Sequence, residues 1–186
     1  FFLGIVMARM LAPSDFGAIG MLAIFFAVSQ SFIDSGFSSA LIRKKDVSED
    51  DFCTTFYFNF LISIVAYLIL FFIAPWVGDF FSMPILCPVL RIQSVTLIIN
   101  AIMAVQVAML KIRLDFKSLA IRNVVATLVS GVCGVILACC GWGIWALVWQ
   151  QIVAAVVNLI CICAACRWIP KKGFCWDSFK QLGAFG

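Results

Sequence analysis

The sequence predicts an all-α integral membrane protein, a bundle of about six transmembrane helices. Of its 186 residues, 65% are hydrophobic and only 12% are charged, and the mean hydropathy is +1.14. A water-soluble fold of this length could not hide so much apolar surface, since soluble chains keep roughly a quarter of their residues charged. A helix that crosses the bilayer needs about 20 mostly apolar residues. The length therefore accommodates five or six spans.

Charge clusters and Pro or Gly residues divide the chain into six apolar segments. The first begins at Phe1 inside an apolar run, which indicates a fragment of a longer protein. Ser14 can cap the second segment. Ser48 and Asp51 form a capping box ahead of the third, so the acidic residues there mark a helix start and not a catalytic pair. The predicted spans are 1–12, 16–42, 52–78, 84–110, 118–140 and 143–166.

The distribution of Lys and Arg predicts the orientation, because basic loops stay in the cytoplasm. Basic residues cluster in every second connection, as expected if each predicted helix crosses the membrane once. The loops assigned to the cytoplasm are 43–51, 111–117 and 167–177, and those assigned to the outside lie near 13–15, 79–84 and 141–143. The net charge of +4 is thus a topology signal, and we expect no nucleic-acid partner.

Most spans carry polar residues along one stripe, although a polar group in hydrocarbon must face protein or water. Two interpretations remain open. The stripes either line a hydrated, substrate-accepting interior, or form hydrogen bonds between helices that are each worth about 1 kcal/mol. The stripes are Gln30, Asp34 and Ser38; Thr55, Asn59 and Ser63; Gln93, Thr96 and Asn100; Asn123, Thr127, Ser130 and Gly134; and Gln151, Ala155 and Asn158.

Three charged residues fall within or near the spans. Asp34 is a functional candidate because a carboxylate inside a span costs a few kcal/mol, unless it lies near the cytoplasmic headgroups and pairs with a base. Arg9 and Arg91 lie toward the outer ends. They either extend to the interface or line a cavity that meets an anionic substrate.

Nine cysteines and no histidine give little support to metal or redox chemistry. Most of the cysteines lie in apolar helices, where Cys behaves as a small apolar residue, and this includes the tight group Cys161, Cys163 and Cys166. We therefore expect no metal site. A membrane enzyme such as a polymerase or acyltransferase would need a large outward loop or a His or carboxylate pair for acid–base work. We expect a protein that is not an enzyme.

Short motifs follow one another almost from end to end. They are Ala8-Arg9-Met10-Leu11-Ala12-Pro13-Ser14-Asp15-Phe16-Gly17, Phe32-Ile33-Asp34-Ser35-Gly36-Phe37, Ala40-Leu41-Ile42-Arg43, Pro84 with Leu90-Arg91, Leu114-Asp115-Phe116-Lys117, Gly141-Trp142-Gly143 with Trp145-Ala146-Leu147-Val148, and Phe179-Lys180-Gln181-Leu182. In this order and spacing, the chain resembles a bacterial polysaccharide (O-antigen or exopolysaccharide) flippase of the multidrug/oligosaccharidyl-lipid/polysaccharide exporter superfamily.

The resemblance implies two six-helix lobes around a central cavity. Residues 1–174 would form the N-terminal lobe, and 175–186 would begin the next segment. Such proteins carry an undecaprenyl-diphosphate-linked oligosaccharide to the outer leaflet of the bacterial cytoplasmic membrane by alternating access. An H⁺ or Na⁺ gradient would supply the energy, with no cofactor. The implied partners are the lipid-linked oligosaccharide, membrane lipids, a polysaccharide polymerase and a chain-length regulator.

Site roles follow from this resemblance and from the polar stripes. Arg9 best matches a cationic cavity group, Arg91 is second, and Asp34 is the candidate for ion coupling. The nearest alternative is a multidrug or metabolite antiporter of the same superfamily, which a cavity rich in carboxylates would favour. The residues predicted to bind substrate are Arg9, Arg91, Gln30, Asn59, Asn100, Asn123 and Gln151.

Overall fold

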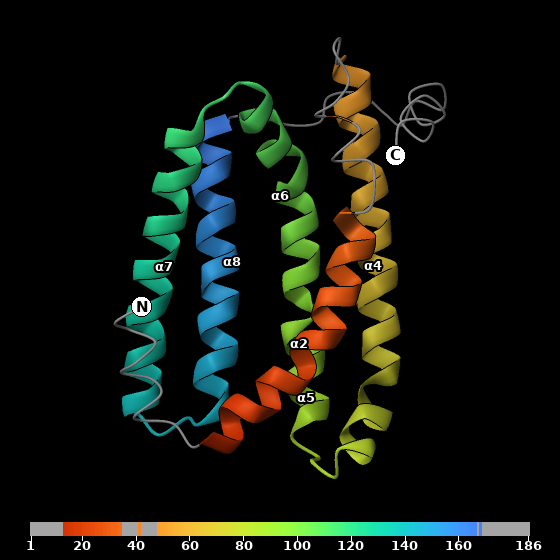
Figure 1. The fold of residues 1–186 in the computed structure, drawn as a ribbon, viewed down its shortest axis with the longest axis vertical. Coiled ribbons are helices and arrows are strands. Elements are labelled where there is room, and N and C mark those ends of the chain that lie inside the picture. Colours follow the sequence, from red (N-terminus) through yellow and green to blue (C-terminus); the bar gives the residue numbers. More distant parts are fainter. Residues whose placement is uncertain (1–12, 35–40, 42–47, 167, 169–186) are drawn as a thin grey trace.

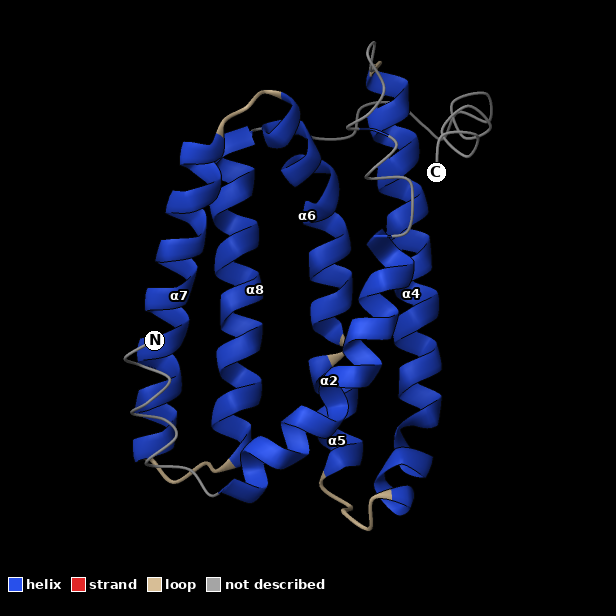
Figure 2. Cartoon of the chain, in the orientation of Figure 1, coloured by secondary structure: helices blue, strands red, loops and turns tan. Residues whose placement is uncertain are grey.

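The computed structural model describes residues 13–34, 41, 48–166 and 168. Within this part of the chain all regular structure is helical, as Figure 2 shows. This confirms the predicted all-α bundle. The helices are α2 (Pro13–Asp34), α4 (Glu49–Phe80), α5 (Leu86–Gln93), α6 (Val95–Ile112), α7 (Phe116–Cys139) and α8 (Ile144–Cys166).

Five stretches of the described residues are long and apolar enough to cross a membrane. They are Ser14–Ile33, Glu49–Phe80, Leu86–Ile112, Phe116–Cys139 and Ile144–Cys166. The predicted span 84–110 corresponds to two helices, α5 and α6, which are interrupted at Ser94. The predicted span 1–12 and most of 35–42 lie outside the described residues. The chain is a multi-pass membrane protein.

The spans run up and down the bundle, with α2 lying obliquely across the others (Figure 1). Helices α7 and α8 form an antiparallel pair, α6 packs against both α8 and α4, and α2 contacts α4, α5, α6 and α8. The connection 113–115 lies at the same end as the start of α4 and the end of α8. The turns 81–85 and 140–143 lie at the opposite end. Successive connections thus alternate between the two ends, as required if each helix crosses the membrane once.

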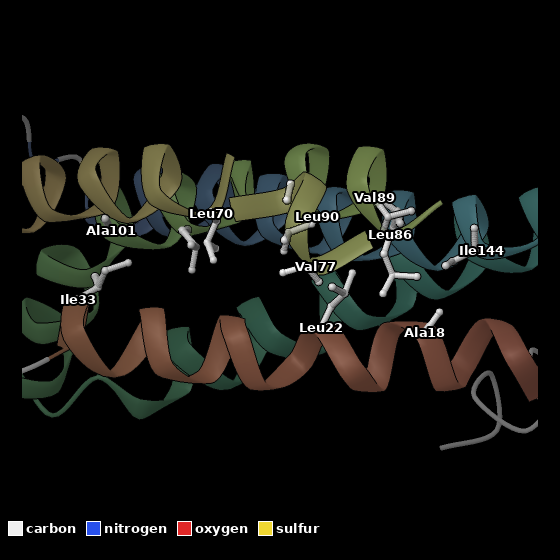
Figure 3. Close-up of a cluster of buried hydrophobic side chains, with 13 residues drawn as sticks. Ala18, Leu22, Ile33, Leu70, Val77, Leu86, Val89, Leu90, Ala101 and Ile144 are labelled. Atoms are coloured by element: carbon white, nitrogen blue, oxygen red, sulfur yellow. The ribbon is translucent and has the colours of Figure 1, made fainter. Parts of the chain in front are cut away.

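The apolar core lies where α2 crosses the other helices. In Figure 3, Leu22 of α2 points toward Val77 of α4, and Leu22, Leu86 and Leu90 have no exposed surface. The outer faces carry large exposed apolar side chains, such as Phe80 at 82% exposure, as expected where lipid is the solvent. The buried cluster contains Ala18, Leu22, Ile33, Leu70, Ala74, Val77, Leu86, Val89, Leu90, Leu97, Ala101, Ile144 and Val148.

Two helices, α4 and α7, begin with a side-chain cap, whereas α5 and α6 do not. The predicted capping box of α4 is confirmed: Ser48 Oγ accepts from the Asp51 N–H at 3.3 Å, and Ser48 N–H donates to Asp51 Oδ2 at 3.0 Å. The prediction that Ser14 caps the second span is wrong, because α2 already includes Pro13. Proline is favoured in a first helical turn, where its missing N–H has no partner to lose.

Trp168 lies just beyond α8 and contacts two helices, α4 and α6, at the end where α4 begins. Its ring makes edge contacts with Phe52 and Phe56 of α4, with centroids 6.3 and 6.2 Å apart. Its main-chain carbonyl accepts from Gln106 Nε2 of α6 at 3.3 Å. These contacts pack the residue that follows α8 against α4 and α6.

Asp115 caps α7 and makes the start of that helix sensitive to acid. Its Oδ1 accepts from the Ser118 N–H at 3.1 Å and its Oδ2 from the Ser118 hydroxyl at 2.6 Å. These hydrogen bonds from Ser118 lower the pKa of the Asp115 carboxyl below its ordinary value. A lowered pKa means that the carboxylate stabilises the helix start above the unfolded-state pKa, and that this stabilisation is lost as the pH falls through the folded-state pKa.

We therefore expect amide-exchange protection in the first turn of α7 to fall as the pH is lowered below about 4. Asp115→Asn keeps a capping oxygen but cannot titrate, so its protection should stay constant over the same range after correction for intrinsic exchange. Hydrogen exchange read by mass spectrometry across 116–119 measures both. An equal loss of protection in the two proteins would show that Asp115 is not the group responsible.

Candidate functional site

One cavity gathers polar side chains from four helices. It has a volume of about 310 Å³ and lies between α2, α5, α6 and α8. The predicted stripes of the second, fourth and sixth spans therefore meet in one place. Its polar lining residues are Gln30, Gln93, Thr96, Asn100 and Gln151, and its apolar ones are Ile19, Ala23, Phe26, Ala27 and Leu97.

Two pairs of amide side chains hold this cavity together. Gln93 Nε2 of α5 donates to Gln151 Oε1 of α8 at 2.5 Å. Asn100 Nδ2 of α6 donates to Gln30 Oε1 of α2 at 3.5 Å. Gln93 Oε1 is buried and accepts no hydrogen bond from the described residues. The lining thus combines interhelical contacts with one buried acceptor oxygen that has no hydrogen-bond partner among the described residues.

Hydroxyl side chains form hydrogen bonds within their own helix, whereas the amides bond to other helices. Ser63 donates to Phe60 O at 2.7 Å, and Thr96 donates to Gln93 O at 2.7 Å. Ser130 likewise turns back to Thr127 O at 3.4 Å. Each hydroxyl therefore bonds a carbonyl three residues earlier in its own helix, a common arrangement for Ser and Thr within helices. The amides are the groups that reach across to other helices and into the cavity.

The helix interruption at Ser94 lies directly beside the cavity. Ser94 Oγ donates to Arg91 O at 2.9 Å, and Leu97 N–H donates to Ser94 O at 3.1 Å. Ser94 keeps helical dihedrals, with φ −63° and ψ −15°, and its N–H donates to Leu90 O at 3.0 Å, so the irregularity is confined to this one residue.

Among the described residues, none that line the cavity carries a charged side chain. Its amide groups both donate and accept hydrogen bonds, and its remaining walls are apolar. Such a lining suits a neutral ligand rich in hydroxyl groups. It offers no charge of its own to neutralise a strongly anionic or cationic ligand.

The structure brings only some of the predicted site residues together. Gln30, Asn100 and Gln151 line the cavity, whereas Asn59 and Asn123 are not among its lining residues. Asn59 has no exposed surface on α4, in line with Thr55 and Ser63, which are also fully buried.

The remaining predicted site residues lie away from this cavity or outside the described residues. Asn123 is exposed on α7, where Arg122 Nη2 donates to its Oδ1 at 3.0 Å. Arg9 lies outside the described residues. Asp34 is the last residue of α2, and its side chain is not among the parts that the structure describes.

Arg91 lies in a separate pocket of about 470 Å³, which residues of α4, α5 and α6 line. Its Nε donates to the main-chain carbonyl of Phe71 at 3.3 Å, and its guanidinium carbon lies 4.3 Å from the centre of the Phe71 ring. Pro75 lies four residues after Phe71 inside α4 and has no N–H to donate to that carbonyl. Arg91 therefore supplies the hydrogen bond that Pro75 removes from the helix.

This role of Arg91 was not anticipated from the sequence. The available signal was Pro75, because a proline within a span frees the carbonyl four residues earlier and requires another donor. The sequence does not identify which donor reaches that carbonyl, since Arg91 is 20 residues from Phe71 along the chain.

Comparison with known proteins identifies the family. Residues 6–186 match the sequence profile of the family described as "Polysaccharide biosynthesis protein". The chain belongs to this family. That result confirms the resemblance to polysaccharide exporters that the motifs predict. No solved structure matches the chain significantly.

Two curated relatives of this family member are named for polysaccharide biosynthesis. The chain is 27% identical over 180 residues to the succinoglycan biosynthesis transport protein ExoT of Rhizobium meliloti (strain 1021), covering 97% of this chain and 36% of ExoT. It is 23% identical over 153 residues to the lipopolysaccharide biosynthesis protein WzxC of Escherichia coli (strain K12), covering 82% of this chain and 30% of WzxC. The chain spans about a third of the length of these relatives.

A double-mutant cycle tests the pairing of Arg91 with Pro75. Arg91→Ala should lower the free energy of unfolding by about 2 kcal/mol, because it removes a charge-assisted hydrogen bond and a cation–π contact. In a Pro75→Ala background the new N–H of residue 75 donates to Phe71 O. The cost of Arg91→Ala should then fall by about 1 kcal/mol or more.

Reversible unfolding in mixed detergent and dodecyl sulfate micelles measures the four proteins of this cycle. Arg113→Ala provides the control, since Arg113 is an exposed arginine at the opposite end of the bundle. Strictly additive costs for positions 75 and 91 would contradict the pairing.

Proposed function

We propose that this chain forms part of a transporter that flips a lipid-linked oligosaccharide across the bacterial cytoplasmic membrane for cell-surface polysaccharide synthesis. The observation that carries the proposal is the uncharged, amide-lined cavity beside the interruption between α5 and α6. Family membership and the names of the two relatives support the same class of cargo.

The chemistry of the cavity fits a sugar. A sugar that crosses hydrocarbon unaided loses the water bound to its hydroxyl groups, at a cost of several kcal/mol for each unpaired group. Amide side chains replace that water because each offers both a carbonyl acceptor and N–H donors. A volume of about 310 Å³ is at the lower end for small-ligand sites, so the cavity would hold one portion of an oligosaccharide at a time.

The energy source and the cationic group are further parts of the proposal. In an alternating-access cycle driven by H⁺ or Na⁺, Asp34 at the end of α2 is the group that we assign to ion coupling. Arg9 remains the candidate for the diphosphate of an undecaprenyl carrier. A polysaccharide polymerase and a chain-length regulator would act on the delivered product.

The alternative function is an antiporter for cationic drugs, and the lining of the cavity disfavours it. Binding a cation at membrane depth calls for a carboxylate in the lining. The part of this lining that the structure describes has none. Its amides suit neutral hydroxyl groups better than they suit a cation.

Replacing one cavity amide should reduce export. Gln151→Leu, introduced into the chromosomal gene, removes the partner of Gln93 and an amide that would contact sugar hydroxyls. We expect export of the glycan to fall about tenfold, which corresponds to one hydrogen-bonding interaction of about 1.4 kcal/mol, and lipid-linked oligosaccharide to accumulate inside the cell. Gln150→Leu is the matched control, because Gln150 is the adjacent residue and does not line the cavity.

Export is measured as surface polysaccharide per amount of membrane-inserted protein, so that a loss of protein is not read as a loss of transport. Equal export by the Gln151 and Gln150 variants, at equal protein levels, would remove the cavity from the proposed mechanism.

The coupling role of Asp34 predicts a different phenotype. Asp34→Asn removes the titratable group without a large change in size, so export should lose its dependence on the ion gradient. A fluorescent analogue of the lipid-linked oligosaccharide serves as the substrate. Its uptake into inverted vesicles, with and without an imposed H⁺ or Na⁺ gradient, measures this dependence. A variant that still responds to the gradient as the parent protein does would exclude Asp34 as the coupling group.

A further inference from the structure

We propose that the Arg91 pocket binds the phosphate of an anionic phospholipid from the outer leaflet of the membrane. This site is distinct from the amide-lined cavity, and the proposal does not depend on what the protein transports. The pocket is lined by Tyr67, Phe71, Cys87, Pro88, Arg91, Ile92 and Val95.

The guanidinium of Arg91 is held in one orientation. Its Nε is engaged with the Phe71 carbonyl at 3.3 Å, and one side of the guanidinium lies against the Phe71 ring at 4.3 Å. No described residue accepts a hydrogen bond from either terminal nitrogen of Arg91. Both terminal nitrogens therefore remain able to donate. A fixed guanidinium with two such donors matches the bidentate geometry of a phosphate group.

The pocket lies on a membrane-facing side of the bundle. Phe72 and Trp76 of α4 are more than two-thirds exposed, and Ile92 and Val95 beside Arg91 are exposed as well. Arg91 lies five residues after the start of α5 at Leu86, which is about 7.5 Å along the helix axis from the 81–85 end of the bundle. A long arginine side chain at that depth reaches the level of lipid phosphates.

The electrostatics of the pocket favour an anion. Arg91 is the one charged residue among the described residues that line the pocket. A cation at the edge of the hydrocarbon is costly unless it meets an anion or water, and the described lining of this pocket contains no carboxylate. A zwitterionic lipid carries its own cation next to the phosphate, so a lipid with net negative charge gains more from Arg91.

The transported substrate is a weaker candidate for this pocket. Gln93 and Thr96 line the amide cavity, whereas Arg91, Ile92 and Val95 line the pocket. The two sets of residues face different spaces on the same interrupted span. A diphosphate bound at Arg91 would thus be separated by α5 and α6 from a sugar in the cavity.

Native mass spectrometry of the purified chain tests the proposal. The micelles contain equal amounts of phosphatidylglycerol and phosphatidylcholine with the same acyl chains, and the count of retained lipids is the readout. We expect the parent protein to retain phosphatidylglycerol in preference, and Arg91→Gln to reduce that retention about tenfold, as for a lost charge-assisted hydrogen bond. Arg113→Gln, which removes an exposed arginine at the other end of the bundle, should retain it as the parent does.

A second variant decides the question if Arg91→Gln fails to fold. Val95→Trp fills the pocket from α6 and leaves Arg91 in place, so it should also reduce retention of phosphatidylglycerol. Undiminished retention in Val95→Trp, or no preference for phosphatidylglycerol in the parent protein, overturns the proposal. Farnesyl diphosphate is added in a separate titration. Retention of it at Arg91 in place of phosphatidylglycerol would also overturn the proposal and assign the pocket to the carrier lipid.

Discussion

The structure depends on one constraint: a polar group at membrane depth must find its partner within the protein. Three kinds of residue meet it in three ways. Ser63 and Thr96 turn their hydroxyls back to their own helices. Gln93 reaches Gln151 on another helix. Arg91 bonds the carbonyl that Pro75 leaves without a donor. The amides line the cavity between α2, α5, α6 and α8, and Arg91 lies in its own pocket beside Phe71.

The two interpretations of the polar stripes, packing contact and cavity lining, are not exclusive. Gln93 and Gln151 hold α5 against α8, and the same two side chains line the cavity. An interhelical hydrogen bond in a membrane is worth only about 1 kcal/mol. A ligand hydroxyl offers a hydrogen bond of similar strength, so a pair of this kind exchanges partners at small cost. Hydroxyls satisfied within one helix gain less from such an exchange.

The sequence predicted the features that depend on local pattern, such as helix type and capping. The helical class and the capping box at Ser48 follow from local pattern, and both are present in the structure. The stripes of Gln30, Asn100 and Gln151 also converge as an inward-facing arrangement requires. The stripe on α7 does not join them, because Asn123 faces outward and α7 packs mainly on α8. Periodicity identifies a polar face but does not show which neighbour covers it.

The span formed by α5 and α6 carries both sites. Helices α5 and α6 each contact α4 on one side and α8 on the other. Arg91 fixes the span to α4 through Phe71, and Gln93 fixes it to α8 through Gln151. Arg91 and Gln93 are two positions apart in the sequence, and Ser94 follows immediately. Since residues one or two positions apart on a helix point in different directions, a single turn can join two neighbours and open two chemically different spaces. The helical spacing of Arg91 and Gln93 within α5 therefore places a cationic site and an amide-lined site on different faces of the same span.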